Sequence, residues 1–193
     1  MTMTTLEDLL VDQVRDLYDA EKQLVRALPK MAEAATSDEL QRAIQSHLEE
    51  TKNQVSRLER IFEELDKPVK AKPCKGMRGL VEEGGEALDG DSKESLTDLA
   101  IIAAAQRVEH YEISAYGTAR AIAMQLGQET VASLLEETED EEKAADLKLT
   151  EIATDLLGSS MEEMDMEMEE DEEPAAPKKT TPPAPGRRRV ARS

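Results

Sequence analysis

The sequence is poor in aromatic residues and in cysteine. Its 193 residues include no Trp, one Phe, three Tyr and one Cys. Strands of β-sandwiches and barrels are rich in aromatic and β-branched residues, so this scarcity argues against an all-β fold. The single Cys74 cannot form a disulfide within the chain. There is no run of 18 or more apolar residues and no signal-peptide core, so we expect a soluble protein of the reducing cytoplasm, with no membrane partner.

Acidic residues dominate the charge. The chain has 43 Asp and Glu against 24 Lys and Arg, which gives a formal net charge of -19. Such a surplus argues against nucleic acid as a partner of the folded body and suits cations better. Surface acidity alone, however, most often serves solubility.

Apolar residues recur at helical spacing in four long segments, which predicts an all-α fold. The first and second helices, and likewise the third and fourth, are joined by short connections and should form antiparallel hairpins. The Pro- and Gly-rich residues 66–91 permit a long crossover between the hairpins, in which 77–88 can hold a short helix. Two hairpins with such a crossover are typical of a ferritin-like four-helix bundle. The predicted helices are 4–35, 38–65, 93–126 and 129–157.

Local signals place the helix ends. Thr36 and Glu39 have the spacing of a capping box before the second helix. Gly127 is predicted to end the third helix and Gly158 the fourth. We therefore predict a folded domain over 1–158 and a disordered tail over 159–193, which is first acidic and then Pro-rich and basic. The basic end could contact nucleic acid or an acidic partner, although a solvated tail is the favoured interpretation.

Each predicted helix also carries acid or imidazole groups on its apolar face. Buried carboxylates are costly unless a positive charge meets them. At a rise of about 1.5 Å per residue, all of these groups lie at a similar height within their hairpins. Hard oxygen ligands and imidazole suit Fe or Mn, and bridging carboxylates let two ions share one site. We therefore predict a site for two Fe or Mn ions, with these ligands: Glu21, His47, Glu50, Glu109, Glu112 and Glu141.

Simpler interpretations exist for the individual residues. In so acidic a chain a single Glu is usually a solvated surface residue, and we expect this of the remaining acids near Glu141, which are Glu137, Glu139, Asp140 and Glu142. His47 alone would more often be a hydrogen-bonded core residue, and His110 is rotated about 100° from Glu109, onto the flank of its helix. Tyr18 and Tyr116 lie one turn from predicted ligands and could pass electrons or hydrogen-bond a carboxylate, although tyrosines more often simply fill a core.

Six segments carry a family resemblance: LYDAEKQL (17–24), HLEET (47–51), CKGM (74–77), GLVEEG (79–84), VEHYEI (108–113) and EEKAAD (141–146). They resemble the YciF-like bacterial stress proteins of the ferritin-like superfamily. The resemblance implies a ferritin-like bundle, a homodimer and a di-iron or di-manganese centre, with a role loosely assigned to stress response. The chain departs from better-known di-iron bundles, which carry Glu-x-x-His on two helices, because it offers the reverse order, His47-x-x-Glu50, and a single inward histidine.

The favoured function is a ferritin-like stress-response protein with a buried dinuclear site, where metal ions would be oxidised by dioxygen or peroxide. Two alternatives stay open. One is a non-catalytic helical stress or scaffold protein with a vestigial site, and the other is a dimanganese catalase-like enzyme. Peroxide turnover by the manganese form would distinguish the latter.

Overall fold

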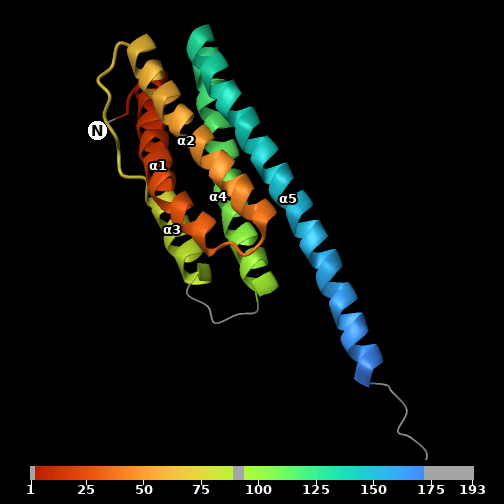
Figure 1. Ribbon diagram of the computed structural model, residues 1–193. Coiled ribbons are helices and arrows are strands. Elements are labelled where there is room, and N and C mark those ends of the chain that lie inside the picture. Colours follow the sequence, from red (N-terminus) through yellow and green to blue (C-terminus); the bar gives the residue numbers. More distant parts are fainter. Residues whose placement is uncertain (1–2, 89–93, 172–193) are drawn as a thin grey trace, which may run out of the picture.

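The computed structural model describes residues 3–88 and 94–171, and all regular secondary structure in these ranges is helical (Figure 1). The prediction of an all-α fold is confirmed. The described residues form five helices, because the segment between the hairpins contains a helix of its own. The helices are α1 (Leu6–Ala34), α2 (Asp38–Glu64), α3 (Lys75–Leu88), α4 (Glu94–Gln125) and α5 (Glu129–Asp171).

The four long helices pack in a closed ring of neighbours. α1 contacts α2, α2 contacts α5, α5 contacts α4, and α4 contacts α1. The short helix α3 lies outside this ring, against α1 and α4. None of the helices in the described part of the chain is both long enough and apolar enough to cross a membrane.

The connection after α2 returns along α1 before α3 begins. The Lys72 amide donates a hydrogen bond of 3.0 Å to the carbonyl of Arg15, and the Cys74 amide donates one of 2.8 Å to Asp19. The Lys72 ammonium also pairs with Asp12 at 2.7 Å. Together with α3, this segment carries the chain from one end of the molecule to the other, so that α4 runs parallel to α2 (Figure 1).

Two of the predicted helix ends need correction. The capping box lies at α1, between Thr5 and Asp8, while α2 is capped by Ser37, whose hydroxyl accepts from the Leu40 amide. Gly158 does not end the last helix, because α5 continues to Asp171. The tail predicted to be disordered from residue 159 thus begins as helical backbone, and its remainder, 172–193, lies outside the described residues.

Asp98 of α4 fixes the turn between α1 and α2. Its buried carboxylate accepts from the Thr36 amide at 2.8 Å, the Thr36 hydroxyl at 2.7 Å and the Ser37 amide at 2.8 Å. Thr36 therefore binds another helix in place of its predicted capping role.

We expect Asp98→Ala to lower the free energy of unfolding by about 3 kcal/mol, because hydrogen bonds to a charged group are each worth about 1.5–3 kcal/mol. Urea denaturation measures this. The exposed control Asp140→Ala should change stability by less than about 0.5 kcal/mol, and equal effects of the two variants would contradict the role of Asp98.

The core consists of two apolar clusters separated by a polar layer. One cluster includes Leu10, Leu17, Phe62, Tyr116 and Leu135. The other includes Leu24, Leu40, Ile44, Ile101 and Leu149. Apart from Asp98, the buried polar residues of the long helices lie near the boundary between the stretches that supply the two clusters: Glu21, His47, Thr51, Gln54, Glu109, Glu112, Thr138, Glu139 and Glu142.

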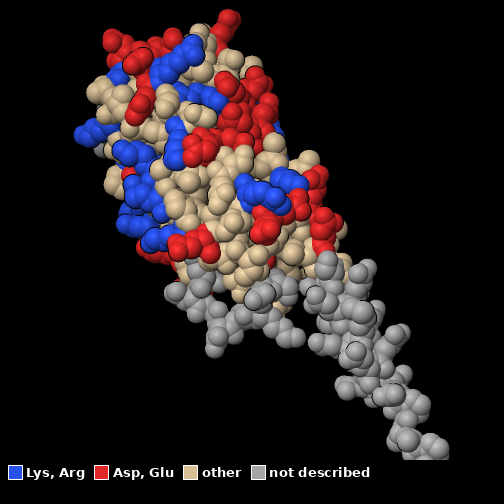
Figure 2. Space-filling model, in the orientation of Figure 1, with Lys and Arg blue, Asp and Glu red and all other residues tan. Residues whose placement is uncertain are grey.

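The surface segregates charge despite the acidic total. Figure 2 shows basic side chains gathered over α1 and α3 at one edge, and acidic side chains concentrated along the upper part of α5. An uncharged band lies between these regions on the same face.

Candidate metal centre

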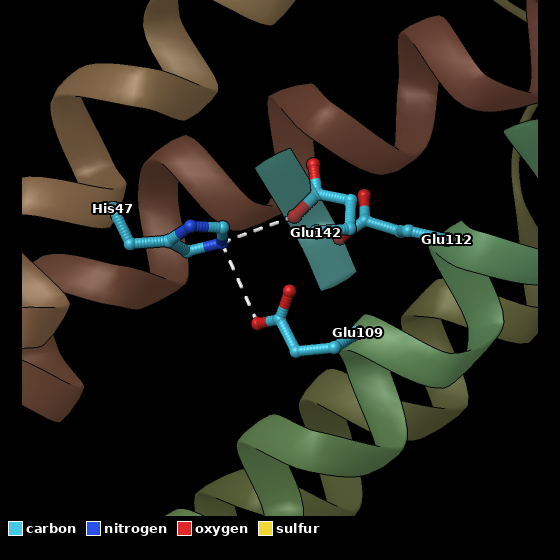
Figure 3. A group of neighbouring side chains, drawn as sticks. All are labelled: His47, Glu109, Glu112 and Glu142. Atoms are coloured by element: carbon cyan, nitrogen blue, oxygen red, sulfur yellow. Dashed lines mark ion pairs between the residues drawn. The ribbon is translucent and has the colours of Figure 1, made fainter. Parts of the chain in front are cut away.

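Four buried side chains converge in the polar layer (Figure 3). His47 of α2, Glu109 and Glu112 of α4 and Glu142 of α5 each offer a ligand atom, and these atoms all lie within 4.8 Å of one another. The His47 Nε2 atom is 3.5 Å from an oxygen of Glu109 and 3.8 Å from an oxygen of Glu142. Three helices thus deliver three carboxylates and one imidazole to a single point.

Glu21 brings the fourth long helix to the same layer. Its side chain is fully buried, and the buried hydroxyl of Tyr116 donates a hydrogen bond to its Oε1 atom. Burial and the neighbouring charge of Glu142 raise the pKa of Glu21 to about 8. When ionised, Glu21 also raises the pKa values of Glu109 and Glu112, so it lies close to the cluster.

Most polar atoms of the cluster have no hydrogen-bond partner among the described residues. This holds for both ring nitrogens of His47, both oxygens of Glu112, both oxygens of Glu142, and one oxygen each of Glu21 and Glu109. Buried polar groups nearly always find a partner, because each unmet one costs free energy. An imidazole surrounded by oxygens that lack donors fits a hard or borderline divalent cation such as Fe or Mn.

The electrostatics of the cluster favour protonated acids in the absence of a cation. Burial raises the pKa of Glu109 to about 8, and burial together with neighbouring carboxylates holds the pKa values of Glu112 and Glu142 well above the usual range. Burial alone would lower the pKa of His47, but the carboxylates of Glu50, Glu142 and Glu21 outweigh it and raise the pKa. Without a cation the acids therefore hold protons near neutral pH, and a cation would displace them.

The structure separates the predicted ligand Glu141 from this cluster. Arg57 of α2 binds both of its oxygens at 2.8 Å, and Gln54 donates to it at 3.0 Å. Burial alone would raise the pKa of Glu141, but these hydrogen bonds outweigh it and lower the pKa. With 29% of its side chain exposed, Glu141 lies in a salt bridge between α2 and α5.

The neighbouring Glu142 occupies the inward position instead. The prediction that Glu142 is a solvated surface residue is wrong, since the residue is 0% exposed. The same expectation is wrong for Glu139, which is buried and pairs with Arg120 and Lys143, and it is confirmed for Glu137 and Asp140. The signal for Glu142 was present in the sequence: buried residues of α5 recur three, four or seven positions apart at Val131, Leu135, Thr138, Glu142 and Leu149.

The other predicted polar residues lie near the cluster or away from it. Glu50 is half exposed, and its Oε2 atom is 3.6 Å from the Nδ1 atom of His47. His110 is exposed beside Asp146, as its flank position predicted. Tyr18 belongs to the core and donates to Glu59 at 2.8 Å. Of the two tyrosines, only Tyr116 contacts an acid of the polar layer, Glu21.

The fold and the cluster define an all-helical protein with a buried acid and histidine site, and comparison with known proteins shows its family. Residues 5–162 match the family described as "Domain of unknown function (DUF892)". Protein YciF of Escherichia coli is 45% identical over 163 residues, which cover 84% of this chain and 98% of that protein. The chain belongs to this family of YciF-like proteins.

Solved structures agree in fold. The E. coli stress protein YciF has a TM-score of 0.79 at 44% identity, covering 81% of this chain and 99% of that one. YcfI of Rhodopseudomonas palustris, for which a structural role has been suggested, has a TM-score of 0.75 at 43% identity, covering 76% and 94% of the two chains. A protein of Xanthomonas campestris shares the fold at 22% identity, with a TM-score of 0.65 over 83% of this chain and 99% of that one.

Proposed function

We propose that this chain is a ferritin-like metal-binding stress protein whose polar layer holds two Fe or Mn ions. The observation that carries the proposal is the convergence of His47, Glu109, Glu112 and Glu142, with ligand atoms within 4.8 Å of one another and without hydrogen-bond partners among the described residues. Glu21 is buried close to the same point, and the half-exposed Glu50 lies 3.6 Å from His47. Glu142 takes the place that the sequence pattern gave to Glu141.

The arrangement of helices supports the ferritin-like part of the proposal. Carboxylate-bridged dimetal sites occur in the core of four-helix bundles with a long crossover, where each helix supplies inward acid or histidine. Here the ring of four long helices surrounds the cluster: three of them supply its residues, and the fourth places Glu21, buried, in the same layer. The described part of the connection between the hairpins, 65–88, runs along the molecule outside this ring.

Residues of the chain have distinct roles at such a site. Two bound ions would supply oxidation chemistry with dioxygen or peroxide. The carboxylates and His47 would bind them, and release of the acidic protons would balance their charge. The Tyr116 hydroxyl orients Glu21, while the two apolar clusters keep water from the layer on both sides.

A stress role and the cellular setting are part of the same proposal. YciF of E. coli is described as a stress protein, and binding free metal together with consumption of an oxidant would suit such a role. We further propose a homodimer in the cytoplasm, on the basis of the family resemblance. Light scattering tests the dimer, and a monomer at micromolar concentration would contradict it.

Elemental analysis of protein expressed with added iron or manganese tests the metal centre directly. We expect about two ions per chain, the number that a carboxylate-bridged site takes. Chelation should lower the melting temperature, since binding to the folded state alone stabilises it. A metal content near zero after expression in both media would contradict the proposal.

A non-catalytic structural protein with a vestigial site is the second candidate. The structural role suggested for YcfI favours it. In that case the acids would remain protonated in the folded protein and chelators would leave the melting temperature unchanged, so the same experiment separates the two candidates.

A further inference from the structure

A cleft between α2 and α5 reaches the metal cluster from the surface. Its volume is about 440 Å³, and it is lined by exposed residues such as Arg42 as well as by the buried His47 and Glu109. Dioxygen and peroxide are far smaller than this space, whereas cavities of roughly 300–1,000 Å³ hold organic ligands.

Most of the wall of the cleft is apolar, and it also includes Ser46 and the Arg57-bound Glu141. The apolar wall residues are Leu28, Ala43, Ile44, Ala105, Ala145 and Leu149. At the inner end lie His47, Glu50 and Glu109, all belonging to or touching the cluster. A ligand that fills the cleft must therefore have an apolar body that extends toward the metal centre.

Charge decides which head group fits the outer end. Arg42 and Lys148 lie there with Glu39. Lys148 pairs with Glu39 at 2.7 Å and also lies 3.7 Å from Glu151, which does not line the cleft. The lining of this end thus has two cations and one acid, and since Lys148 is paired with Glu39, Arg42 can bind an anionic group. An anionic head group would be attracted to this end.

We propose that the cleft binds an apolar organic carboxylate of medium chain length, with its carboxylate at Arg42 and its apolar body directed toward His47. The ligand would then lie next to the metal ions, and this adjacency rests on the proposed function. The binding itself depends only on the cleft. A bidentate Arg–carboxylate contact supplies the orientation, and the burial of the chain supplies most of the affinity.

Isothermal titration calorimetry with decanoate tests the proposal, on both metal-loaded and chelator-treated full-length protein. We expect saturable one-to-one binding. Ala43→Phe on α2 and Ala145→Phe on α5, which fill the cleft from opposite sides, should each weaken binding by at least about 10-fold, because they remove the space for the chain. The control Ala103→Phe, on an exposed position of α4 outside the cleft, should bind like the wild type. The absence of saturable binding, or wild-type affinity in both cleft variants with helicity intact, would overturn the inference.

Arg42→Ala tests the orientation of the ligand. It should weaken decanoate about 10-fold, the loss of one charge-assisted contact, and should leave decan-1-ol unaffected. Equal effects on both ligands would overturn the proposed anchor. Metal content measured on the same samples separates the two proposals. Protein that carries two ions but does not bind decanoate would contradict only the proposed ligand, and protein that binds decanoate but carries no metal would contradict only the proposed metal centre.

Discussion

Replacing Glu142 with Gln is expected to weaken metal binding by more than about 100-fold, whereas Glu141→Gln should leave it near the wild-type value. Glu142 is fully buried, and its oxygens face His47, Glu109 and Glu112. Mutation of a residue that only hydrogen-bonds a metal ligand already lowers metal affinity about 10–100-fold. Loss of a ligand itself should therefore lower it more. Glu141 instead binds Arg57 and Gln54, and these contacts do not involve the cluster.

Elemental analysis and competition with a chromophoric chelator measure the two affinities. The variants are a matched pair, because they differ by one residue of the same helix and make the same chemical change. Circular dichroism confirms that both remain helical. Retention of metal by Glu142→Gln together with loss in Glu141→Gln would show that α5 presents the other acid to the metals.

The layer of the fold that holds the site could be predicted from the sequence. Counting residues from the turns at Thr36 and Gly127 sets the height of each acid, because a helix rises by a constant amount per residue. Four predicted ligands, Glu21, His47, Glu109 and Glu112, accordingly share the buried layer in the structure. Height along a helix is a robust quantity, since an error of one residue moves a side chain by only about 1.5 Å.

The direction in which a side chain points is harder to predict than its height along the helix. One residue turns the helix by about 100°, so Glu141 and Glu142 share a height but point to different neighbours. The stretch Glu136–Glu142 contains acids at all but one position, and this density hid the apolar stripe that continues through Thr138 to Glu142. The Arg57 partner of Glu141 comes from 84 residues away, a contact that no local pattern reveals.

The stability of the metal-free protein is expected to fall as the pH rises from about 4.5 to about 8. The pKa values of Glu21 and Glu109 are raised from 4.5 to about 8 by burial, and those of Glu112 and Glu142 also lie well above 4.5. In this window the unfolded chain has released protons that the folded chain still holds, so the free energy of unfolding decreases with increasing pH. His47, whose pKa is also raised, acts in the same direction. The decrease should be at least a few kcal/mol, since each pKa unit of each group corresponds to about 1.4 kcal/mol.

Urea denaturation in the presence of a chelator, at intervals between pH 5 and pH 8.5, measures this slope. Repulsion among surface carboxylates also grows with pH in so acidic a chain, and the double variant Glu112→Gln and Glu142→Gln removes only the buried contribution, so its slope should be clearly smaller. Bound metal should reverse the trend, because the ions bind ionised carboxylates and their affinity therefore increases with pH. A metal-free protein that becomes more stable toward pH 8 would mean that the buried acids are already ionised, and that some positive group other than a metal neutralises the layer between the two apolar clusters.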